Sequence, residues 1–92
     1  MTLITLTLLD GKSSSISDVI FSPDGLRVLA AGGRQIFIYS AVDGTLVQAL
    51  SGHKELVTCL AYARDGKRYA SGSLDKSVII WSNSNAGLLK FQ

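Results

Sequence analysis

Few side chains in this sequence could perform acid–base or metal chemistry, and the most suggestive pair is His53 with Asp75. A histidine beside a carboxylate can form a catalytic dyad or supply two ligands to a metal ion. The chain has no second histidine, however, and its only cysteine, Cys59, lies on another predicted strand, while Asp75 fits a structural turn. We therefore expect no catalytic site, no metal and no other cofactor, and structural roles for His53 and Asp75.

Two other patterns could indicate ligand binding, and both have simpler explanations. The AGGR stretch at 31–34 matches neither the phosphate-binding loop nor the dinucleotide fingerprint, and no helix follows it. The aromatic residues that could stack on nucleic-acid bases fall on predicted inner strands and are expected in the core: Phe21, Phe37, Tyr62 and Tyr69. The net charge of +2 also gives no indication of nucleic acid or an anionic membrane as a partner.

The elements that must position these side chains are short β-strands joined by turns that contain Gly and Asp. Apolar and β-branched runs that end at such turns predict an all-β chain. The expected strands cover residues 2–9, 16–21, 27–31, 35–39, 45–50, 57–62, 68–72, 77–81 and 88–91. Cys59 lies inside one of these apolar runs, so we expect a buried thiol in a reducing compartment.

The sequence contains an internal repeat. FSPDGLRVLAAGGRQIFIYS aligns with AYARDGKRYASGSLDKSVIIWS, so that Asp24 matches Asp65 at an offset of 41 residues and Tyr39 matches Trp81 at an offset of 42. A period of about 40 to 45 residues with four strands per repeat is typical of a propeller blade. We therefore expect two four-stranded blades, at 16–50 and 56–91, after a leading outer strand at 2–9.

The second repeat, LSGHKELVTCLAYARDGKRYASGSLDKSVIIWS, resembles the WD-repeat β-propeller family in its Gly-His, its turns and its final Trp. The resemblance implies a buried hydrogen-bond chain through His53, a serine of the next strand, Asp75 and Trp81. Ser71 and Ser73 point to the same face and both fit the serine position, and we favour Ser71. The first repeat lacks the Gly-His, the turn Asp and the Trp, so its chain is expected to be missing or rebuilt.

Two blades cannot close a propeller, which needs at least about four. The expected fold is therefore an incomplete propeller that spans 1–92, either the start of a longer protein or a unit of which several copies assemble. By resemblance, the leading strand is the outer strand that latches the ends of the ring or an outer strand of a neighbouring blade.

A closer resemblance is carried by GTLVQALSGHKELVTCLAYARDGKRYASGSLDKSVIIW, with FSPDG ahead of it and GLLK behind. These residues are similar to the first repeats of the intraflagellar transport protein 122 family, a subunit of intraflagellar transport complex A. The resemblance implies a non-catalytic scaffold for retrograde ciliary transport and cilium assembly, with other complex A subunits as protein partners. Alternatives are a self-assembling structural unit or an adaptor of another WD-repeat family, such as a vesicle-coat or ubiquitin-ligase subunit.

Partner binding is expected at one face, because propellers bind through the loops that share a face. The residues that we place there are Ser14, Ser15, Arg34, Lys54, Glu55 and Lys76, and those on the opposite rim are Arg64, Lys67 and Arg68. The sequence contains no run of about 18 apolar residues, which is the length that could span a membrane. We expect a cytoplasmic protein, located by resemblance at the cilium or flagellum and its base.

Overall fold

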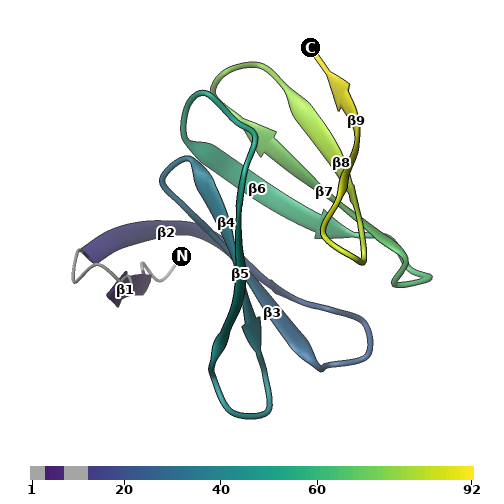
Figure 1. Cartoon of the computed structure of the whole chain (residues 1–92). Helices are drawn as coiled ribbons and strands as arrows, with labels where there is room; N and C mark the ends of the chain where they lie inside the picture. The colour runs from purple at the N-terminus through teal and green to yellow at the C-terminus, as the bar shows by residue number, and fades with distance from the viewer. Residues whose placement is uncertain (1–3, 8–12) are drawn as a thin grey trace.

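The computed structural model describes residues 4–7 and 13–92, and all regular structure in them is β-strand. The strands are β1 Ile4–Thr7, β2 Ser13–Phe21, β3 Arg27–Gly32, β4 Gln35–Ser40, β5 Leu46–Ser51, β6 Val57–Tyr62, β7 Arg68–Ser73, β8 Val78–Ser82 and β9 Gly87–Phe91. They form two antiparallel sheets, ordered β1-β2-β3-β4-β5 and β6-β7-β8-β9, which Figure 1 shows side by side. Among the described residues there is no helix long and apolar enough to cross a bilayer.

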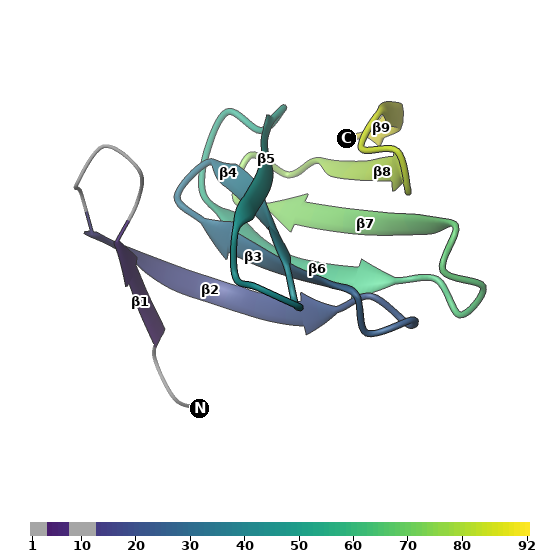
Figure 2. The same ribbon diagram turned by 60° about the horizontal axis from the view of Figure 1, so that its bottom comes forward.

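The expected fold class is confirmed: the leading strand and the four strands of the first repeat form one five-stranded sheet, the second repeat forms a four-stranded sheet, and the two do not close into a ring. β1 pairs with the beginning of β2, from Ile4 opposite Ile16 to Thr7 opposite Ser13. Figure 2 shows β1 at the border of the first sheet, away from the second. Residues 2, 3, 8 and 9 of the expected leading strand lie outside the described residues, and its role as an outer strand of another blade stays a prediction.

Matching Asp-Gly turns end the first strand of each repeat. Gly25 and Gly66 adopt positive φ angles of 74° and 72°, which residues with a Cβ rarely adopt. The carboxylates of Asp24 and Asp65 each accept a hydrogen bond of 2.9 Å from the backbone N–H two residues later. The same turn chemistry therefore sets the hairpin in both repeats.

The core lies between the two sheets, because each turns one apolar face toward the other. The buried cluster is Leu29, Ala31, Ile36, Ile38 and Leu50 from the first sheet with Val57, Leu60, Tyr69, Ile79 and Trp81 from the second. Polar bonds flank this core: Arg27 Nη1 donates to the Asn83 carbonyl at 3.0 Å, and Asn85 Nδ2 donates to Gln48 Oε1 at 3.1 Å. The sheets are thus joined by apolar packing and by hydrogen bonds at its margin.

Asp18 provides a further link between the sheets. It lies at an irregularity in the β2–β3 pairing, where the register shifts between Ile16 and Asp18. Its Oδ1 accepts a hydrogen bond from the Val19 N–H, and its Oδ2 accepts one from the Leu60 N–H of β6, both at 2.9 Å. One carboxylate therefore satisfies backbone donors from both repeats.

Two expectations about the core were wrong. Cys59 is exposed, although its strand is apolar, and the Phe21 side chain is 63% exposed. Each residue lies on the face of its sheet that points away from the other sheet, and neither side chain is covered there. A strand pattern shows that a face is apolar without showing what covers it.

Candidate interaction face and its supporting network

Three loops gather at one end of the sheets, at the upper left of Figure 1. They are the β3–β4, β5–β6 and β7–β8 loops, which we call the loop face. The Val57 N–H donates to the Gly33 carbonyl at 2.9 Å, and the Leu74 N–H donates to the Leu56 carbonyl at 3.0 Å. These backbone bonds hold the β5–β6 loop to both of its neighbours.

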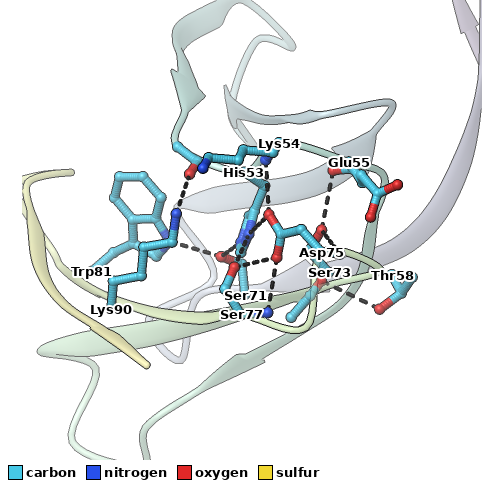
Figure 3. A network of polar contacts seen from close by, with 12 residues as sticks. His53, Lys54, Glu55, Thr58, Ser71, Ser73, Asp75, Ser77, Trp81 and Lys90 are labelled. Atoms are coloured by element: carbon cyan, nitrogen blue, oxygen red, sulfur yellow. Dashed lines mark hydrogen bonds and ion pairs between the residues drawn. The ribbon is translucent and has the colours of Figure 1, made fainter. Parts of the chain in front are cut away.

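A buried hydrogen-bond chain supports the loop face from within the second sheet (Figure 3). Trp81 Nε1 donates to Ser71 Oγ at 2.9 Å, and Ser71 Oγ lies 2.7 Å from His53 Nε2. His53 Nδ1 lies 2.9 Å from Ser77 Oγ, and the Ser77 hydroxyl donates to Asp75 Oδ1. The chain thus runs from β8 through β7 and the β5–β6 loop to the β7–β8 loop.

The direction in which hydrogen bonds are donated along this network follows from the groups at its two ends. The Trp81 indole can only donate and an ionised Asp75 can only accept. Since the Ser77 hydroxyl donates to Asp75, its oxygen accepts from His53 Nδ1–H. His53 Nε2 then accepts from the Ser71 hydroxyl. A neutral imidazole with its proton on Nδ1 satisfies every group, which is how buried polar atoms are normally arranged.

Asp75 is the point where this chain meets the loop backbone. Its Oδ2 accepts from the Lys54 N–H and its Oδ1 from the Ser77 N–H, both at 2.8 Å. The Ser77 hydroxyl bond, assisted by these N–H groups, holds the pKa of Asp75 well below its usual range against the opposing effect of burial. His53 Nδ1 also lies 3.4 Å from Asp75 Oδ2. The carboxylate is therefore a fixed anion that fastens one loop to the next.

The structure brings together four residues singled out from the sequence: His53, Ser71, Asp75 and Trp81. Ser73 lies elsewhere, where its hydroxyl donates to the Glu55 carbonyl at 3.1 Å and accepts from the Asp75 N–H at 3.2 Å. Ser77, which the sequence analysis did not select, connects the imidazole to the carboxylate. An Asp followed two residues later by Ser is a recognisable turn signal, because the Asp carboxylate commonly accepts from that backbone N–H.

The first sheet has a different core at the corresponding positions. Ala30 replaces Ser71 and Tyr39 replaces Trp81, so in the described part of this sheet the same chain cannot form. Ala30 is 2% exposed and is paired with Phe37, which is also buried. Apolar packing thus takes the place of the polar chain.

The structure places four of the residues proposed to face a partner on the loop face and exposes all of them: Arg34, Lys54, Glu55 and Lys76. Leu56 and Leu74 on the same loops are also exposed, by 50% and 58%. Ser14 and Ser15 lie in β2, and their side chains are outside the described part of the structure.

The loop face therefore presents three cations, one carboxylate and two leucines on a fixed backbone. Within the described ranges, no group of three or more His, Cys, Asp or Glu side chains could hold a metal ion. Exposed apolar side chains among charges on rigidly held loops are suited to binding another macromolecule.

Comparison with known proteins finds a match to each of the two repeats seen in the structure. The family model "WD domain, G-beta repeat" (WD40) matches residues 3–40 and 44–82. The human intraflagellar transport protein 122 homolog is 51% identical over 86 residues, which cover 94% of this chain and 7% of that protein. The Xenopus tropicalis homolog is 51% identical over 82 residues, 89% of this chain and 7% of that protein. The chain thus spans less than a tenth of the length of these relatives.

More distant similarities show the same fold in another setting. The Xenopus laevis U3 small nucleolar RNA-associated protein 15 homolog is 30% identical over 92 residues, 88% of this chain and 18% of that protein. The solved structure of the RRP9 WD40 repeats superposes with a TM-score of 0.85 at 28% identity, covering 98% of this chain and 28% of that one.

Proposed function

Because this chain belongs to the WD domain, G-beta repeat family, we propose that it is a non-catalytic scaffold that binds other subunits of intraflagellar transport complex A. The observation that carries the proposal is the 51% identity to intraflagellar transport protein 122 homologs over 89–94% of the chain. The U3-associated relatives share the repeat at only 30–35% identity. The additional identity supports the ciliary setting over the nucleolar one.

The loop face is the surface that we assign to the partner. Its loops are fastened by the Asp75 carboxylate and by backbone bonds, so little conformational freedom is lost when a partner docks. Three cations against one carboxylate favour an acidic partner surface, and the exposed Leu56 and Leu74 can contact apolar groups at its centre.

This role places the protein in the cytoplasm, at the cilium or flagellum and its base. Complex A acts along the cilium, so a scaffold subunit of this complex is expected at the same location as the other subunits. Tagged chain expressed in ciliated cells should therefore concentrate at the ciliary base. A purely nucleolar signal would favour the setting of the U3-associated relatives instead.

Binding to purified complex A subunits tests the proposal. Reversing the charges of Arg34 and Lys76 to Glu should weaken binding by about tenfold or more, equivalent to about 1.4 kcal/mol. The matched control reverses Arg64 and Lys67 to Glu on the opposite rim, where both side chains are also exposed. This control should bind as the wild type does. Absence of binding by the wild-type chain would refute the complex A assignment.

A further inference from the structure

The outer edges of the two sheets are candidate sites for strand addition. β5 ends the first sheet and β9 ends the second, at the borders away from β2 and β6, the first strands of the two repeats. Neighbouring blades of a propeller pack on the faces of a sheet, so its outer edge stays open however many blades the ring contains. Such an edge presents backbone N–H and C=O groups with which an extended segment of another chain can pair.

Alternate residues of β5 direct their backbone groups outward. At the end of β4, the Ser40 N–H donates to the Thr45 carbonyl and the Ser40 carbonyl accepts from the Gly44 N–H, both at 2.9 Å. Ser40 therefore directs both of its backbone groups toward β5. Backbone groups alternate between the two edges along an antiparallel strand, so Phe37 directs its own toward β3. Ala49 lies opposite Phe37, and its N–H and carbonyl therefore point away from the sheet.

The two outer edges differ in how they are protected from pairing. Lys90 of β9 occupies the place that Ala49 occupies in β5, and its ammonium donates to the Gly52 carbonyl at 3.3 Å (Figure 3). A lysine on an edge strand hinders pairing with another chain. The segment at 45–51, TLVQALS, contains no charged residue, no proline and no glycine. β5 is therefore the less protected of the two outer edges.

The regular part of the β5 edge adjoins the loop face. The pairing of β5 with β4 shifts register beside Val47, so the regular stretch is Gln48–Ser51. Arg34 and Lys54 are exposed and lie just beyond the C-terminal end of this stretch, on the loop face. An extended segment paired with Gln48–Ser51 therefore has one end beside two positive charges.

We propose that the partner bound at the loop face adds an extended segment to β5, antiparallel to it. This inference rests on the proposed function and specifies how the partner is held. Antiparallel pairing is slightly more stable per residue than parallel pairing, and it places the N-terminal end of the segment beside Arg34 and Lys54. A carboxylate is favoured at that end. The recognised sequence is thus an Asp or Glu followed by about four uncharged residues of high β propensity.

A second copy of this chain fits the same edge less well. In an antiparallel pair of two β5 strands, the register shift beside Val47 in each copy would shorten the paired stretch. Residues 44–47 also separate Asp43, the nearest acidic residue before β5, from the regular stretch, so its carboxylate would not lie at the end of the pairing. The edge is therefore assigned to a partner, and self-pairing is an outcome that the experiment distinguishes.

Hydrogen exchange of this chain with purified complex A subunits tests strand addition at individual amides. In the free chain the outward amides of Ala49 and, two positions later, Ser51 should exchange fast, whereas Leu50, which directs its N–H to β4, should exchange slowly. Bound subunits should slow both outward amides by about tenfold or more. Protection of the loop face without protection of Ala49 would overturn strand addition and leave the proposed function standing. Slowing of Ala49 in the chain alone as its concentration rises would assign the edge to a second copy and also overturn it.

A substitution at the same position provides a second test. Ala49→Pro removes the outward N–H, which makes none of the bonds between β4 and β5, so the variant should fold, as circular dichroism checks, and should bind subunits about tenfold more weakly. Two controls should bind as the wild type does: Ala49→Ser keeps the N–H, and Lys90→Pro makes the same change at the equivalent place in β9. A folded Ala49→Pro variant with wild-type affinity would overturn the inference. Absence of binding by the wild-type chain would refute the proposed function and this inference together.

Discussion

The Asp18 carboxylate offers a direct way to measure how strongly the two repeats are coupled. Asp18→Ala removes the acceptor from the Val19 and Leu60 N–H groups, which Asp18 binds at 2.9 Å. Leu60 is only 7% exposed, so water cannot readily replace the lost partner. A hydrogen bond to a charged group contributes about 1.5–3 kcal/mol, and we expect a loss of about 2–3 kcal/mol in the free energy of unfolding.

Urea denaturation at one fixed protein concentration, followed by the fluorescence of the buried Trp81, measures this loss. Each kcal/mol should also lower Tm by roughly 4–8 °C for a domain of this size. The matched control is Asp43→Ala, whose carboxylate accepts hydrogen bonds from Thr45 in the exposed β4–β5 turn. The control should cost less than about 1 kcal/mol, because water can replace exposed hydrogen bonds.

Amide hydrogen exchange then separates coupling between the sheets from a general loss of stability. In Asp18→Ala the Leu60 amide should exchange faster relative to other β6 amides, since its acceptor comes from the other sheet. If the variant keeps both the wild-type urea midpoint and the slow Leu60 exchange, Asp18 does not couple the repeats as described.

The supporting network and the core give three further predictions. Ser71→Ala should lower the free energy of unfolding by about 1–3 kcal/mol in urea titrations, because Trp81 Nε1 loses its acceptor, and Ser73→Ala should cost less. The folded pKa of Asp75 lies below the unfolded value, so its contribution to stability is present above about pH 4 and is lost as pH falls through the folded pKa; Asp75→Asn should flatten the acid limb of the urea midpoint against pH. Burial raises the pKa of Tyr69, so the contribution of its neutral phenol to the stability of the fold is complete below about pH 10 and is lost above it. In an absorbance titration at alkaline pH, the ionisation of Tyr69 should accompany unfolding, and reversible ionisation in the folded protein would contradict this.

Local sequence signals were sufficient for the strands and turns. The Asp-Gly turns at Asp24 and Asp65 and the apolar runs between turns predict strands whose observed ends differ by only a few residues from the expected ones. These features depend on short-range backbone preferences, which a single sequence displays. The largest difference is at β2, which begins at Ser13 because β1 pairs with it.

Features that depend on long-range geometry could not be predicted in the same way. The link from Asp18 to Leu60 requires both a register shift in β2 and the approach of the other sheet. The exposure of Cys59 and Phe21 depends on which sheet face is covered, which strand periodicity does not reveal. Ser77 is an intermediate case, since its turn with Asp75 has a local signal and its bond to His53 does not.

Hydrogen exchange of this chain with and without purified intraflagellar transport complex A subunits is the most direct test of its role as a scaffold. The account predicts protection of backbone amides in the three loops of the loop face, around Arg34, Lys54 and Lys76, with no change around Arg64 on the opposite rim. Protection limited to the opposite rim, or no protection at all, would contradict it.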